Sequence, residues 1–138
     1  ESGADIVIGT DPDCDRMGVA VRGNNSEFEL LTGNQIGSLM LYYRIKTLFD
    51  SGIINSKNVE NAVIIKTFVT TDLQKSIAEK FGVKLINTLT GFKYISQKLS
   101  KYERSLPKDV IKDYRRMSVT QAMSAQLNDG TFMIFGGE

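Results

Sequence analysis

The central segment of the chain reads AVIIKTFVTTDLQKSIAEKFGVKLI (residues 62–86) and predicts a strand, a helix and a second strand. The run Ala62-Val63-Ile64-Ile65 is short, apolar and β-branched, which is typical of a buried strand. Asp72 begins an amphipathic helix whose apolar side chains recur at helical spacing until Gly82 ends it. Val83–Ile86 then predicts the second strand. A strand–helix–strand order favours a parallel pairing of the two strands.

The flanking segments continue this alternation toward both ends. Toward the C-terminus we expect a helix over 94–102, a charged helical insertion over 104–117, a short helix over 119–127 and a last strand over 131–135. Toward the N-terminus we expect a buried strand over 5–9, a β-hairpin over 17–31 and a helix from 34 that ends before Gly52. The chain is therefore predicted to be an α/β protein, with a mainly parallel sheet covered by helices and preceded by a hairpin segment.

Composition argues against several classes of protein. The 17 basic and 16 acidic side chains nearly cancel, so no general attraction to nucleic acid or to a membrane surface is expected. No apolar run is long enough to span a bilayer, and no secretory signal is apparent. The lack of a secretory signal and the single cysteine together favour a cytoplasmic location. The absence of histidine removes the commonest general base.

An acidic loop follows the first predicted strand and carries Asp11, Asp13 and Asp15 beside Arg16. Three carboxylates at alternate positions can converge on one hard cation, and their oxygens suit Mg²⁺ or Ca²⁺. Arg16 is an unusual neighbour for a plain cation site. It becomes useful if the ligand also brings a phosphate, which a guanidinium can grip with two hydrogen bonds.

Three other kinds of acidic loop share features with this one. An inert, solvated acidic turn remains open, although three crowded carboxylates repel one another without a counterion. An EF-hand is excluded, because it needs Gly at the sixth loop position and Glu at the twelfth, where Arg16 and Arg22 stand. An aspartyl-phosphate transferase would use Asp11 as nucleophile and Asp13 as acid. That enzyme class usually has Thr or Val in place of Asp15, so it is a weak alternative.

Other candidate residues follow the ends of the predicted parallel strands, where ligands bind in such sheets. They are Lys66, the loop residues Thr90, Gly91 and Lys93, and Glu138 at the end of the last strand segment. Lys66 could act as a general acid or base, or could be a surface lysine at a strand end. Lys93 lies in the first turn of a predicted helix, where backbone N–H groups and its ammonium could face an anionic substrate.

In four ordered motifs the sequence resembles the α-D-phosphohexomutase superfamily of phosphoglucomutases and phosphomannomutases. The motifs are Thr10-Asp11-Pro12-Asp13-Cys14-Asp15-Arg16, Leu31-Thr32-Gly33-Asn34, Thr90-Gly91-Phe92-Lys93-Tyr94-Ile95 and Gly136-Gly137-Glu138. The resemblance implies interconversion of sugar 1-phosphates and 6-phosphates through a phosphoserine and a bisphosphorylated sugar. It also implies a three-layer α/β/α domain with a small mixed sheet, whose last strand runs antiparallel.

The same resemblance implies roles for single residues. Asp11, Asp13 and Asp15 would hold Mg²⁺, and Arg16 would lie close to the phosphoserine. Glu138 would accept hydrogen bonds from sugar hydroxyls, and Lys66 would lie near the reacting hydroxyl.

We expect the chain to be a central fragment, with residues 1–32 ending the second domain and residues 33–138 forming most of the third. The phosphoserine loop and the C-terminal phosphate-binding loop are missing from it, so the isolated chain should be inactive. The expected partners are a hexose or pentose phosphate and the remaining domains of the parent chain. The other possible function is a non-catalytic module that binds a sugar phosphate or a partner.

Overall fold

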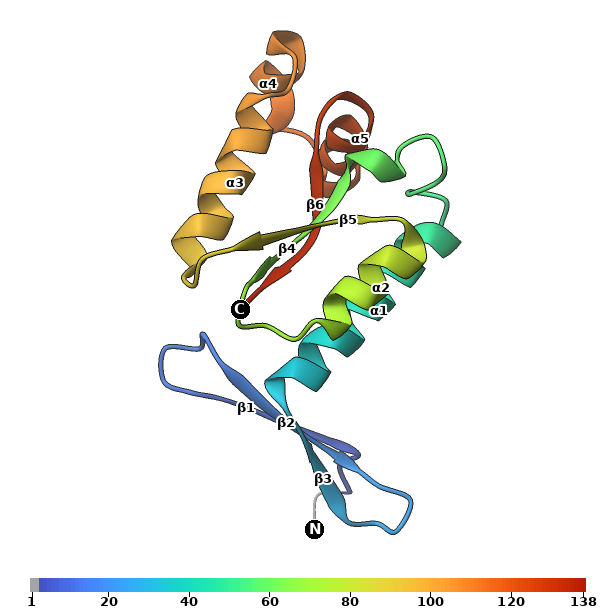
Figure 1. Ribbon diagram of the computed structural model, residues 1–138, viewed down its shortest axis with the longest axis vertical. Coiled ribbons are helices and arrows are strands. Elements are labelled where there is room, and N and C mark those ends of the chain that lie inside the picture. Colours follow the sequence, from blue (N-terminus) through green and yellow to red (C-terminus); the bar gives the residue numbers. More distant parts are fainter. Residues whose placement is uncertain (1–2) are drawn as a thin grey trace. The chain divides into compact units, whose positions relative to one another are not determined.

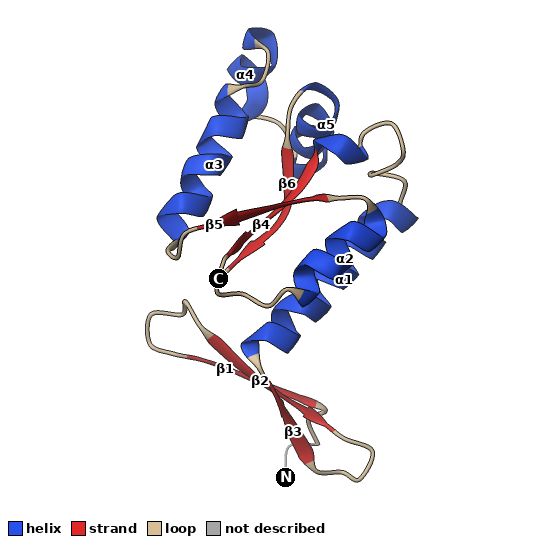
Figure 2. Ribbon diagram, viewed as in Figure 1, coloured by secondary structure: helices blue, strands red, loops and turns tan. Residues whose placement is uncertain are grey.

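The computed structural model describes residues 3–138 of the chain. It divides into two compact units, Glu1–Met40 and Leu41–Glu138, and each has a sheet of its own. Strands and helices are distinguished by colour in Figure 2. Within the described residues, no helix is both long enough and apolar enough to cross a bilayer.

The first unit contains an antiparallel sheet of three strands in the order β1-β2-β3. The strands are β1 (Ile6–Thr10), β2 (Met17–Arg22) and β3 (Phe28–Leu31), so the predicted strand and hairpin are confirmed. The predicted burial of the first strand is wrong, because every residue of β1 is exposed. Successive strand residues point to opposite faces, so exposure along the whole of β1 means that neither of its faces is covered in this unit.

The second unit is built on a parallel sheet with the strand order β5-β4-β6. Its strands are β4 (Ala62–Thr67), β5 (Lys84–Thr88) and β6 (Phe132–Gly137). Its helices are α1 (Gly33–Asp50), which begins in the first unit, the 3₁₀ turn η1 (Val59–Asn61), α2 (Leu73–Phe81), α3 (Phe92–Arg104), α4 (Lys108–Tyr114) and α5 (Val119–Asp129). The predicted alternation of strands and helices is confirmed.

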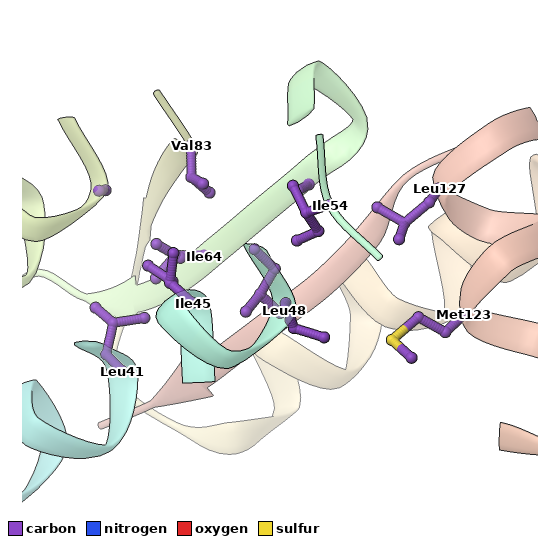
Figure 3. Packing of buried hydrophobic residues seen from close by; sticks show 11 residues of the cluster. Leu41, Ile45, Leu48, Ile54, Ile64, Val83, Met123 and Leu127 are labelled. Carbon is purple, nitrogen blue, oxygen red and sulfur yellow. The ribbon is translucent and has the colours of Figure 1, made fainter. Parts of the chain in front are cut away.

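Helices cover both faces of this sheet, as Figure 1 shows for α3 on one face and for α1 and α2 on the other. One apolar cluster joins Ile64 of β4 to side chains of α1, α2 and α5 (Figure 3). A smaller cluster joins Val63 and Ile65 to Ile95 of α3. Alternation along β4 therefore supplies both layers of core, which confirms the predicted three-layer α/β/α arrangement.

Two expectations need correction. The sheet of the second unit is not mixed, because β4 pairs in parallel with both β5 and β6. The chain passes through α3, α4 and α5 before β6, and this long crossover returns it in the same direction. The insertion over 104–117 is helical as predicted, but it is not wholly solvated, since Leu106 is buried.

Candidate metal and substrate site

The acidic loop lies between β1 and β2 and curls back on itself. The Cys14 N–H donates to the Asp11 carbonyl at 3.0 Å, and Cys14 takes a left-handed conformation with φ of 58°. This turn places Asp11, Asp13 and Asp15 so that each offers a carboxylate oxygen within 4.8 Å of the others. The predicted convergence of the three carboxylates is therefore present in the fold.

Arg16 pairs with the first of these carboxylates. Its Nε donates to Asp11 Oδ2 at 2.8 Å, and its backbone N–H donates to Asp11 Oδ1 at 3.3 Å. Burial alone would raise the pKa of Asp11, but the hydrogen bonds that its side chain makes, those from Arg16 before those with Asp15 and Asp13, together hold that pKa below the usual value for aspartate. Asp11 is therefore kept ionised, which is the state that a metal ligand requires.

The loop fits a small divalent cation. Two ligands on opposite sides of Mg²⁺ lie about 4.2 Å apart, twice the metal–oxygen distance. The spacing of up to 4.8 Å between the carboxylate oxygens is slightly wider than this. Asp13 and Asp15 are exposed, so small side-chain rotations would close the difference. Asp11 would share its oxygens between the cation and Arg16, or release the guanidinium.

At the carboxyl ends of the parallel strands, the structure brings two of the predicted substrate residues together. The Gly91 N–H donates to Glu138 Oε2 at 3.0 Å, although the two residues are far apart in the sequence. Gly91 is the residue before α3, so the Glu138 carboxylate lies at the positive end of that helix. The other carboxylate oxygen of Glu138 makes no hydrogen bond in the described residues.

The two remaining residues of this group, Thr90 and Lys93, are exposed beside Gly91. The Lys93 ammonium lies 4.9 Å from the centre of the Tyr94 ring. Lys93 also contributes to a shallow groove of about 670 Å³ along α3, which Lys101 and Arg104 line as well. Of the four predicted substrate residues, the contacts therefore join Gly91 and Glu138, while Thr90 and Lys93 lie exposed next to Gly91 in the chain.

Gly91 is required by its backbone conformation, which has φ of 110°. We expect Gly91→Ala to lower the free energy of unfolding by about 1–3 kcal/mol, because L residues rarely adopt this conformation. Urea titration followed by circular dichroism measures the change. Gly33→Ala is the control, since Gly33 begins α1 with free space around it and no positive φ. Equal effects of the two substitutions would contradict the argument.

Lys66 lies at the end of β4 and is only 1% exposed. Its Nζ donates to the Thr70 carbonyl at 2.7 Å and lies 3.4 Å from Asp72 Oδ1. The alternative that Lys66 is a surface lysine at a strand end is therefore wrong. A role in proton transfer stays a prediction.

The partners of Lys66 are not among the residues predicted from the sequence. The sequence predicts Asp72 only as a helix start, yet its side chain makes no capping bond to α2 and instead faces Lys66. One signal was available. A lysine that directly follows Ile64 and Ile65 in a buried strand needs an acceptor, and Asp72 is the next acidic residue along the chain.

Sequence comparison adds independent information. The family described as phosphoglucomutase/phosphomannomutase, alpha/beta/alpha domain III, matches residues 32–106. The phosphoglucomutase of Staphylococcus aureus (strain N315) is 38% identical over 99 residues, which cover 72% of this chain and 16% of that protein. The phosphoglucomutase of Staphylococcus epidermidis is 38% identical over 96 residues, covering 70% of this chain and 16% of that protein. The chain thus spans about a sixth of these relatives.

Structure comparison agrees at the level of the fold. Aspergillus fumigatus N-acetylphosphoglucosamine mutase, in complex with GlcNAc-6P and magnesium, aligns with a TM-score of 0.53 and 19% identity. The alignment covers 92% of this chain and 29% of that one. The apo form of an N-acetylglucosamine-phosphate mutase of the alpha-D-phosphohexomutase superfamily aligns with a TM-score of 0.50 and 16% identity, covering 89% of this chain and 30% of that one. With the acidic loop, the strand-end loops and the domain match in place, the chain belongs to the phosphoglucomutase/phosphomannomutase family.

Proposed function

We propose that this chain is a central part of a phosphoglucomutase-like phosphohexomutase. The complete enzyme would interconvert sugar 1-phosphates and 6-phosphates through a phosphoserine and a bisphosphorylated sugar. The observation that carries the proposal is the convergence of Asp11, Asp13 and Asp15 in a chain whose following residues match domain III of the family. Residues 1–32 would end the second domain and residues 33–138 would form most of the third.

In this proposal the acidic loop holds Mg²⁺ through Asp11, Asp13 and Asp15. The bound ion would neutralise negative charge on the phosphoryl group that is transferred. Arg16 would contribute a second cationic group at the same place. Its side chain is 82% exposed and its guanidinium is already oriented by Asp11, so it could grip phosphate oxygens in a bidentate manner. The magnesium named with the fungal structural neighbour is consistent with this assignment.

The strand-end loops would hold the sugar phosphate. Lys93 and the N-terminus of α3 offer positive charge to a substrate phosphate, and Thr90 offers a hydroxyl. Glu138 would accept hydrogen bonds from sugar hydroxyls. Because Gly91 already holds one of its oxygens, the other could face the sugar in a fixed direction. A carboxylate that recognises hydroxyls rather than phosphate could accept the same sugar in either orientation.

Two further functions predict different results. A non-catalytic module that binds a sugar phosphate or a partner would show binding but no turnover even within the full-length protein. An aspartyl-phosphate transferase would acquire a covalent phosphate on Asp11. Both Asp11 oxygens bond to Arg16, which lowers their nucleophilicity, so we rank this alternative last. Mass spectrometry after incubation with phosphoryl donors tests it directly.

The purified 138-residue chain is expected to show no mutase turnover and only weak affinity for Mg²⁺. It lacks a phosphoserine loop, and Mg²⁺ in such sites relies on substrate phosphates as well as on one or two carboxylates. A coupled assay of glucose 6-phosphate formation from glucose 1-phosphate measures turnover, and calorimetry measures metal binding. A full-length phosphoglucomutase that carries this segment is the positive control, tested on glucose, mannose, ribose and glucosamine phosphates. Turnover by the isolated chain would refute the proposed division of the site between domains.

A further inference from the structure

The end of β4 holds an unusual concentration of buried polar side chains. Three of the five buried polar or charged residues described lie between positions 66 and 74, namely Lys66, Thr67 and Gln74. Alternation along the strand places Lys66 on the same face as Ala62 and Ile64, which belong to the larger apolar cluster. A buried ammonium beside such a cluster is unfavourable unless the protein provides it with acceptors. The groups that Lys66 contacts therefore indicate the role of its buried ammonium.

Those contacts all lead to one short segment, Thr67–Asp72, which connects β4 to α2. Lys66 Nζ donates to the Thr70 carbonyl at 2.7 Å and lies 3.4 Å from the Asp72 carboxylate. The segment is closed further by a hydrogen bond between the hydroxyls of Thr67 and Thr70, 3.1 Å apart, and by the Thr70 N–H, which donates to the Thr67 carbonyl. The buried Lys66 side chain thus binds the loop that directly follows it in the chain.

Asp72, at the start of α2, is the second partner of Lys66. It occupies the N-cap position of α2 but makes no side-chain capping bond, and its carboxylate faces Lys66 instead. The Thr71 hydroxyl accepts from the Leu73 N–H at 3.2 Å and so takes part in capping. The carboxylate of Asp72 therefore pairs with Lys66 and does not cap α2.

This segment also touches the proposed substrate loop. The Phe68 N–H donates to the Thr88 carbonyl at 3.1 Å, and Thr88 is the last residue of β5, two positions before Thr90. Phe68 and Val69 form the tip of the segment and are 62% and 59% exposed. A shift of the segment would therefore move both this tip and the start of the loop that holds Gly91.

We propose that Lys66 is a positioning residue, which fixes the segment Thr67–Asp72 and through it the strand-end loop at Thr88–Gly91. In this proposal Lys66 acts through the loop backbone that its buried side chain binds, and another group carries the proton of the reaction. The structural part of this inference stands on the contacts alone. Its consequence for catalysis depends on the proposed mutase function.

Hydrogen exchange of the 138-residue chain tests the structural part. Lys66→Met keeps most of the side-chain length but removes the donor, and should accelerate exchange of the amides in 67–73 and 88–91 by about tenfold or more. The melting temperature should fall by about 4–8 °C or more. Lys84→Met is the matched control, since Lys84 is an exposed lysine in the neighbouring strand β5, and both readouts should stay unchanged. Unchanged exchange of 67–73 in Lys66→Met would overturn the proposal.

Kinetics of a full-length phosphoglucomutase that carries this segment test the catalytic part. Lys66→Arg keeps donors and charge, but a guanidinium cannot release a proton at neutral pH. A positioning role predicts that kcat/KM stays within about tenfold of the parent and that both limbs of its pH profile remain, because general acid–base groups are usually worth at least about 100-fold. A larger loss with normal exchange of 67–73 would overturn it. A parent enzyme without mutase activity would refute the proposed function but leave the exchange result standing.

Discussion

Asp13→Asn is expected to lower kcat/KM of a full-length phosphoglucomutase that carries this segment by at least about 100-fold. A bound divalent cation stabilises the transferring phosphoryl group by several kcal/mol, and each 1.36 kcal/mol corresponds to about tenfold in rate. Asparagine keeps the shape of the side chain but removes one of the three negative charges in the loop. The activity should recover in part when the concentration of Mg²⁺ is raised, because the lost term is metal affinity. Steady-state kinetics over a range of Mg²⁺ concentrations measures both effects.

The matched control for this experiment is Asp109→Asn. Asp109 is an exposed aspartate in the first turn of α4 and is not among the proposed metal-binding or substrate-binding residues. Its substitution should change kcat/KM by less than about twofold, as is usual for exposed sites. If Asp13→Asn kept full activity at every Mg²⁺ concentration, the acidic loop would be the inert turn that the sequence alone left open.

Ile64→Ala should remove a large part of the stability of the second unit. Ile64 is 0% exposed in the central strand and packs among the side chains of α1, α2 and α5. Truncation of a fully buried isoleucine costs about 2–5 kcal/mol, from the lost burial and from the cavity that remains. Small domains are stable by only about 5–15 kcal/mol, so a loss of this size is severe. Urea unfolding followed by circular dichroism and by tyrosine fluorescence measures it.

Ile111→Ala provides the comparison for this change. Ile111 lies in α4 and is 37% exposed, so the same truncation should cost less than about 1 kcal/mol. The slope of free energy against urea should stay the same in both variants if each unfolds from the same folded state. Equal losses at the two positions would show that the cluster around Ile64 is not the main core.

The sequence predicted the parallel core of the second unit well, for a physical reason. Strands buried on both faces form unbroken apolar runs such as Ala62–Ile65, and glycine ends α2 at Gly82 in a left-handed conformation. These signals lie in neighbouring residues, so they can be recognised without knowledge of the tertiary structure. The acidic loop is equally local, because five successive residues from Asp11 to Asp15 close it.

Contacts between distant segments could not be predicted in this way. The bond from Gly91 to Glu138 depends on the strand order that brings the ends of β5 and β6 to one edge. The exposure of β1 was missed because an apolar run such as Ile6-Val7-Ile8 indicates what a strand could bury, and not whether anything covers it. The burial of Lys66 was missed because the sequence shows its position but not the loop above it.

The strand order β5-β4-β6 also has a consequence for how the second unit folds. Val63 can pair with Lys84 as soon as α2 has formed between them, whereas Ala62 must wait for Phe132, after three more helices. Closing the longer loop costs more chain entropy and delays the last edge of the sheet. During synthesis, one side of β4 would therefore stay unpaired until almost the whole segment has left the ribosome, and this open edge is where a nascent chain would most need protection from aggregation.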